Sequence, residues 1–218
     1  CTDASATCLF DIQDRMWSAP LLAAAEIPAR WLPPLHASTD VVGTLRPAVA
    51  EALGVPAGTP VVCGAGDQEA QAVGNGILRP HAVSATIGTG GQVFTPLAEC
   101  KHDPALRVHT FCHVMPDLWH WEAAVLTAGA ALSWLRDHIL DGVHDYTALA
   151  NAAAEMQPGA EGLVFLPYLA GERTPHMDPN VRGTFHGLTL RHTWRHMARA
   201  IIEGVLFALK DGLTCFAD

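Results

Sequence analysis

The segment 61–95 constrains the fold of this chain most, because it holds two glycine turns that each follow a short apolar run. Val61–Cys63 precede Gly64-Ala65-Gly66, and this pattern predicts a short buried strand followed by a turn. A short helix should then begin at or beside Asp67 and end at Gly74 and Gly76. The run 83–87 predicts a second strand, and Gly88-Thr89-Gly90-Gly91 predicts a second turn before the chain extends again from Gln92.

Residues of these two turns are suited to phosphoryl transfer. Gly88, Gly90 and Gly91 lack a Cβ, so backbone N–H groups can approach phosphate oxygens there, and Thr89 adds a hydroxyl. A carboxylate at a strand end, here Asp67, can accept a proton from a sugar hydroxyl that attacks a γ-phosphoryl group. A purely structural explanation stays open, in which Asp67 only caps a helix and the glycines only make a hairpin.

Several familiar motifs are excluded. Glu69 stands where a dinucleotide-binding fingerprint needs its third glycine, and no Gly-Lys-Ser/Thr follows either turn, so the turns are not Walker loops. A hydrolase is set aside because the chain has no Gly-x-Ser-x-Gly. His109, Cys112 and His113 resemble scattered zinc ligands. Cys112 and His113 are neighbours on a predicted strand, however, and therefore face opposite sides, so no metal site is predicted.

Composition narrows the partners and the compartment. The chain has 218 residues and a net charge of −9 without a basic cluster, which argues against nucleic acid as a partner. No apolar run is long enough for a membrane span, and no signal peptide is visible, so a cytoplasmic location is expected. The six irregularly spaced cysteines predict reduced, buried thiols. The chain begins at Cys1 in mid-pattern, which suggests a fragment of a longer protein.

Periodicity and breakers predict the remaining elements. We expect a strand at 41–45 and a helix at 47–53, followed after a break near 78–81 by strands around 107–114 and 118–122. A helix from 127 to 140 should present Leu132, Leu135 and Ile139 as an apolar stripe. A helix at 146–156, a buried strand at 163–166 and a long helix from 193 to 216 complete the pattern. Glu172 and Arg173 form a candidate ion pair, for which a structural or solvated role is expected.

Two longer motifs carry a resemblance to a known family. The sequence Gly183-Thr184-Phe185-His186-Gly187-Leu188 is followed, after seven residues, by His196-Met197-Ala198-Arg199-Ala200-Ile201-Ile202-Glu203. Together with the paired turns, this pattern resembles the FGGY family of carbohydrate kinases. Leu166–His176 and His109–His113 make it most similar to the xylulokinases of that family. The resemblance covers nearly the whole chain but only the middle of a family member.

The resemblance implies an α/β fold of the actin/hexokinase type, with parts of two ribonuclease-H-like domains flanking a cleft. Residues 1–80 would be the C-terminal part of the first, sugar-binding domain, and 81–218 the N-terminal part of the second, nucleotide-binding domain. The implied partners are a small sugar and ATP with Mg²⁺. The magnesium anchor is expected outside this chain, and a homodimer is compatible with the family.

The implied activity is ATP-dependent phosphorylation of a ketopentose, with D-xylulose converted to D-xylulose 5-phosphate as the first expectation. Asp67 would be the general base, and Gln68, where xylulokinases usually have asparagine, would contact a sugar hydroxyl. Gly88, Thr89, Gly90 and Gly91 would hold phosphate. Gly129 and Ser133 would border the nucleotide, although Ser133 replaces a glutamine of the related glycerol kinases, and Gly129 could equally serve close helix packing. The alternatives are a kinase for ribulose, glycerol or gluconate, or an inactive fragment that acts only as a binding module.

Overall fold

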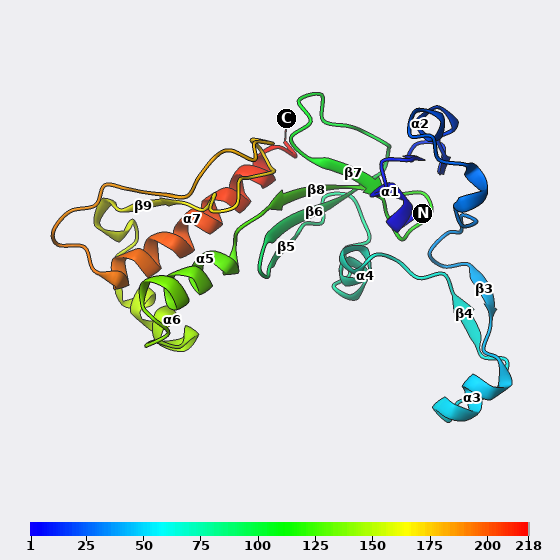
Figure 1. Cartoon of the computed structure of the whole chain (residues 1–218), viewed down its shortest axis with the longest axis horizontal. Helices are drawn as coiled ribbons and strands as arrows, with labels where there is room; N and C mark the ends of the chain where they lie inside the picture. The colour runs from blue at the N-terminus through cyan, green and yellow to red at the C-terminus, as the bar shows by residue number, and fades with distance from the viewer. Residues whose placement is uncertain (218) are drawn as a thin grey trace. The chain divides into compact units, whose positions relative to one another are not determined.

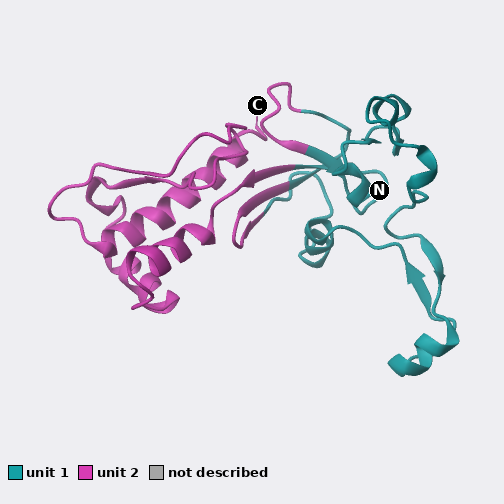
Figure 2. Ribbon diagram, in the orientation of Figure 1, with its two compact units in different colours: residues 1–84, 95–102, 110–121 teal, residues 85–94, 103–109, 122–218 magenta. Residues whose placement is uncertain are grey.

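The computed structural model describes residues 1–217 as an α/β protein with two compact units (Figures 1 and 2). Unit 1 contains residues 1–84, 95–102 and 110–121, and unit 2 contains residues 85–94, 103–109 and those from 122 onward. A four-stranded sheet has the strand order β5 (Ser84–Ile87), β6 (Gly91–Leu97), β8 (Trp119–Val125), β7 (His109–Cys112). Each of these four strands is divided between the two units. The domain division expected from the sequence, 1–80 and 81–218, is a different division of the chain and stays a prediction.

Unit 1 is built from short elements and small two-stranded ribbons. Its elements outside the four-stranded sheet are α1 (Thr2–Ser5), β1 (Phe10–Asp11), β2 (Met16–Trp17), α2 (Ala19–Ala24), η1 (Ala29–Trp31), β3 (Val41–Thr44), α3 (Pro47–Leu53), β4 (Pro60–Val62) and α4 (Asp67–Gly74). A small core of Ala4, Phe10 and Cys112 gathers Trp17 and Trp119 around it. A hydrogen bond joins α1 to the four-stranded sheet, because the Cys112 N–H of β7 donates to the Ser5 hydroxyl (3.1 Å).

The expectation of a buried strand at 61–63 is wrong. β4 pairs with β3 in an isolated antiparallel ribbon, and Val61 and Val62 are 39% and 55% exposed. An apolar run predicts that a strand has hydrophobic faces, but burial also needs a covering layer, and no described residue supplies one here. The expectation of uniformly buried thiols is also wrong, because Cys8 and Cys63 are exposed while Cys112 and Cys215 are buried.

Unit 2 is organised around the long helix α7 (Trp194–Thr214). Its other elements are α5 (Gly129–Trp134), the π-helical turn η2 (Leu135–Ile139), α6 (Tyr146–Glu155), η3 (Ala160–Gly162), β9 (Val164–Leu166) and β10 (Thr184–His186). α7 packs on both α6 and β9 and buries Ile201, Val205 and Leu209. Gly204 allows the closest approach, since a Cβ there would overlap the Phe165 carbonyl oxygen.

Several apolar residues of unit 2 are more exposed than their sequence patterns predicted. β9 alternates, with Phe165 buried and Val164 and Leu166 exposed, so it is half-buried rather than fully buried. Ile139 is 45% exposed and leaves the stripe that Leu135 anchors, because the α-helix changes to a π-helical turn at residue 135. At the end of α7, Leu213 continues the four-residue spacing of Val205 and Leu209 but is exposed.

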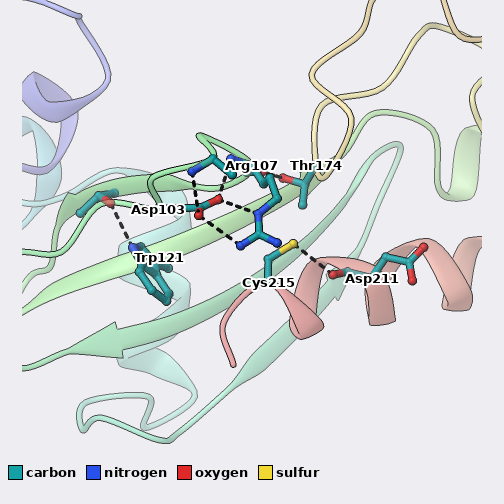
Figure 3. Close-up of polar contacts among 8 residues, drawn as sticks. Asp103, Arg107, Trp121, Thr174, Asp211 and Cys215 are labelled. Carbon is teal, nitrogen blue, oxygen red and sulfur yellow. Dashed lines mark hydrogen bonds and ion pairs between the residues drawn. The ribbon is translucent and has the colours of Figure 1, made fainter. Parts of the chain in front are cut away.

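A polar network fixes the strand β8 within unit 2 (Figure 3). Asp103 accepts from Arg107 Nε (2.9 Å) and Nη2 (3.1 Å), and this pairing lowers the pKa of Asp103 to about 2. The Thr174 hydroxyl donates to the Arg107 carbonyl oxygen (2.7 Å) and accepts from the Ala124 N–H (3.1 Å). The loop that follows β9 is thereby tied to β8. None of the helices formed by residues 1–217 combines the length and apolar character that a membrane crossing requires.

Candidate active site

The glycine turn 88–91 joins β5 to β6 and packs directly on the start of α5. The turn is closed by a hydrogen bond from the Gly88 N–H to the Gly90 carbonyl oxygen (2.8 Å). Its outward carbonyl groups accept from the beginning of α5: Gly88 O from Gly129 N (2.8 Å), and Thr89 O from Ala128 N (3.0 Å) and Ala130 N (3.1 Å). The structure therefore brings Gly88–Gly91 and Gly129, which were predicted from separate segments, into one cluster of unit 2.

Two glycines of this cluster, Gly129 and Gly90, face backbone oxygens too closely for a side chain, and Gly91 lies tightly against a leucine side chain. A Cβ on Gly129 would lie 2.5 Å from the Gly88 carbonyl oxygen, and one on Gly90 would lie 2.9 Å from that of Val125. A Cβ on Gly91 would lie 3.0 Å from Leu209 Cδ2. The close-packing explanation of Gly129 is thus supported by the geometry, and its contact with a nucleotide stays a prediction.

Two backbone N–H groups of the turn have no acceptor among the described residues. In the part of the chain that the structure describes, no group accepts from the N–H of Thr89 or of Gly90. Gly88 and Thr89 are exposed and Gly90 is half-buried. The first N–H groups of α5, in contrast, are occupied by carbonyl groups of the turn. A phosphate in this cluster would therefore be held by the turn itself rather than by the end of α5.

Ser133 lies one helical turn after Gly129, but its hydroxyl faces other helical groups. Ser133 Oγ donates to the Gly129 carbonyl oxygen (3.2 Å) and shares a hydrogen bond with the Tyr146 hydroxyl (2.8 Å). These contacts link α5 to α6. The described contacts of Ser133 are therefore structural, and its predicted role beside the nucleotide has no other support from them.

Asp67 is the first residue of α4, where free N–H groups and the helix dipole favour a carboxylate. Gly66 is the N-cap, and its N–H donates to the Thr2 hydroxyl (3.1 Å). The Asp67 side chain is exposed, and the neighbouring Gln68 is half-buried. Asp67 and Gln68 belong to unit 1 and the glycine turn to unit 2, so their shared site stays a prediction (Figure 2).

Glu69 is a feature of α4 that the sequence patterns did not single out. It is 7% exposed, and its Oε1 lies 3.8 Å from Nε2 of the fully buried His120. Burial raises the pKa of Glu69, while burial and then the neighbouring His113 lower the pKa of His120 to about 3. Because Glu69 stands at the third helical position, a carboxylate folding back over the N-terminus of α4 could have been suspected from the sequence.

Glu172, which the sequence suggested as the partner of Arg173, makes its contacts with backbone groups instead. It is 2% exposed, and its Oε1 accepts from the N–H of Leu126 (2.8 Å) and of Arg173 (2.7 Å). The Arg173 side chain is exposed. Glu172 therefore supports backbone, in agreement with a structural role, although through N–H groups rather than through the guanidinium group suggested by the sequence.

The fold defined by these elements is that of the actin/hexokinase-like sugar kinases. A xylulose kinase from Rhodospirillum rubrum superposes with a TM-score of 0.80 at 36% identity, covering 93% of this chain and 41% of that one. The family model for the N-terminal domain of FGGY carbohydrate kinases matches residues 1–74. The family model for their C-terminal domain matches residues 83–218. The chain therefore belongs to the FGGY family of carbohydrate kinases.

Relatives with curated names are similar over almost the whole chain. A xylulose kinase of Escherichia coli is 39% identical over 212 residues, which are 97% of this chain and 43% of the relative. A gluconokinase of Bacillus subtilis is 34% identical over 217 residues, which are 94% of this chain and 42% of the relative. The chain thus spans less than half the length of the curated relatives that it matches.

Proposed function

We propose that this chain supplies the general base and a phosphate-binding turn of an ATP-dependent kinase that converts D-xylulose to D-xylulose 5-phosphate. The observation that carries the proposal is the turn 88–91, where the N–H groups of the exposed Thr89 and the half-buried Gly90 have no acceptor within the described residues. Backbone donors of this kind suit phosphate oxygens. The exposed carboxylate of Asp67 suits proton transfer.

The reaction follows from the chemistry of these groups. Asp67 accepts the proton of the sugar's terminal hydroxyl as that oxygen bonds to the γ-phosphorus of ATP, and the bond from that phosphorus to the bridging oxygen of ADP breaks. The turn amides hold phosphate oxygens in place, and Gln68 contacts a second sugar hydroxyl. Magnesium would come with the nucleotide as part of the substrate, and its chemistry there would be to offset phosphate charge. We assign it no ligand among residues 1–217, where no group of three or more metal-ligating side chains converges.

The similarity to xylulose kinases favours a ketopentose substrate. A second candidate, gluconate, is favoured by the similarity to a gluconokinase at 34% identity. Gln68 would help to decide between these two substrates, because it is half-buried and next to the proposed base in the sequence, where it can contact a substrate hydroxyl.

A coupled ADP-release assay tests the proposal with xylulose, ribulose, glycerol and gluconate as acceptors. It should be run on the 218-residue chain and on a polypeptide that extends it to the full length of its curated relatives. We expect xylulose-dependent ADP release from the longer polypeptide. Preferential turnover of gluconate would favour the second candidate. Binding of sugar or Mg·ATP without turnover in either polypeptide would instead identify a binding module.

A further inference from the structure

The backbone segment 125–130 lies between the glycine turn and the carboxylate of Glu172. On one side, Ala128, Gly129 and Ala130 donate their N–H groups to the turn. A Cβ placed on Gly90 would also lie within 2.9 Å of the Val125 carbonyl oxygen, so the turn and this segment are in direct contact. On the other side, the Leu126 N–H donates to Glu172 Oε1 at 2.8 Å. All of these residues belong to unit 2.

Glu172 is well placed to fix this segment. Its loop is anchored independently by Thr174, which bonds both Ala124 N and the Arg107 carbonyl oxygen. The same Oε1 atom also accepts from the N–H of Arg173 (2.7 Å), so the carboxylate is locked to its own backbone. An acceptor with two converging donors in a buried position has little freedom to move.

We propose that Glu172 is a positioning residue for phosphate binding: by holding Leu126, it fixes the segment on which the turn 88–91 packs and so aims the Thr89 and Gly90 N–H groups. This inference rests on the proposed function of the turn. No hydrogen bond among the described residues joins Glu172 to the turn, so Glu172 acts on it through residues 125–130.

The two carboxylate oxygens of Glu172 are bonded differently, so glutamine and alanine at this position form a matched pair of variants. Both hydrogen bonds use Oε1, and Oε2 has no hydrogen-bond partner among the described residues. The amide oxygen of a glutamine can therefore replace Oε1 and accept both bonds without a charge. Burial also raises the pKa of Glu172, so a neutral group is tolerated at this position. Glu172→Gln should preserve positioning, whereas Glu172→Ala removes it.

Hydrogen exchange tests the positioning without any ligand. In Glu172→Ala, we expect faster exchange of the Ala128, Gly129 and Ala130 amides, and wild-type rates in Glu172→Gln. Glu203→Ala is the control, because Glu203 accepts from the Gly159 N–H (3.0 Å) and from Arg199 (2.6 Å) in the same unit but away from the turn. It should leave those three amides unchanged. Unchanged exchange in Glu172→Ala would overturn the inference.

Mg·ATP binding and turnover by the extended polypeptide test the functional consequence. For Glu172→Ala we expect the KM for ATP to rise about tenfold, as for the loss of one buried hydrogen bond. The KM for xylulose should stay unchanged, and Glu172→Gln should remain within about twofold of wild type. Faster exchange with an unchanged KM for ATP would also overturn the inference. If wild type fails to bind Mg·ATP, the proposed function fails, and the exchange rates alone then decide whether Glu172 orders the turn.

Discussion

At the scale of single residues, Gly129 shows how a missing side chain permits the glycine turn to pack. Gly129→Ala would place a Cβ 2.5 Å from the Gly88 carbonyl oxygen, so the turn must shift. We expect a loss of about 1–3 kcal/mol in the free energy of unfolding, typical of overpacking, together with weaker Mg·ATP binding. Urea unfolding and calorimetric titration measure the two effects.

Gly74→Ala is the matched control for this prediction. Gly74 ends α4, and no atom of the described residues lies within 4 Å of the point where an alanine Cβ would stand, so alanine should be neutral or stabilise by up to about 1 kcal/mol. Equal effects of the two substitutions would show that the contact between Gly129 and the turn is not tight in solution.

Asp67 is the residue on which the proposed chemistry depends. Asp67→Asn removes the proton acceptor while keeping size and polarity, so kcat should fall by about 10²–10⁴ with little change in the KM for ATP. Steady-state kinetics of the extended polypeptide measure this. Asp3→Asn removes a neighbouring carboxylate near the Gly66 N-cap and should retain activity. Wild-type turnover by Asp67→Asn would exclude Asp67 as the base.

At the scale of elements, α7 supplies much of the packing in unit 2. α7 packs on β9 and α6; its Ile201 is 1% exposed, whereas Leu206 on the same helix is 50% exposed. Ile201→Ala should therefore lower the free energy of unfolding by about 2–5 kcal/mol, and Leu206→Ala by well under about 1 kcal/mol. Urea titrations followed by circular dichroism compare the two, and similar losses would mean that α7 is not packed as described.

The burial of His120 on β8 in unit 1 should make stability depend on pH. His120 has a pKa of about 3 when folded, against 6.5 for the free side chain, so the unfolded chain binds the proton more strongly. Stability from this group is complete above pH 6.5 and is lost as the pH falls toward 3. Between pH 7 and 5 the loss should be roughly 2 kcal/mol.

His120→Gln isolates this effect, because glutamine does not titrate. The difference in urea midpoint between pH 7 and pH 5 should be smaller in the variant than in wild type. The raised pKa of Glu69 acts with the opposite sign at lower pH, but it is common to both proteins. An identical pH dependence in the two would contradict the assignment of a neutral, buried His120.

Local signals predicted the elements whose ends depend on local chemistry. The helix at 47–53 begins with Pro47 and ends at Gly54 in the left-handed conformation (φ 67°), as the sequence suggested. Asp145 caps α6 through the Ala148 N–H. In contrast, the role of Glu172 depends on Leu126, which is 46 residues away, and no local pattern contains that information.

At the scale of the whole molecule, the sequence indicated the family but not which apolar surfaces are covered. Val41, Val62 and Leu53 are all more than half exposed although their patterns suit a protein interior. Hydrophobic periodicity reports what an element could bury, and burial itself depends on neighbours brought in by tertiary structure. The shared site of Asp67 and the turn has the same dependence and stays a prediction.

The cysteines of this protein differ in burial, so their rates of alkylation report how often each unit opens. Cys112 (0% exposed) lies in unit 1 and Cys215 (4% exposed) in unit 2, while Cys8 and Cys63 are open to reagent. In a timed alkylation followed by peptide mass spectrometry, Cys8 and Cys63 should be modified first. Cys112 and Cys215 should then react only at the rates at which their own surroundings unfold. Immediate labelling of Cys112 or Cys215 would show that the surroundings of that thiol open readily in the folded protein. One reagent can therefore compare the stability of the two units without an introduced probe.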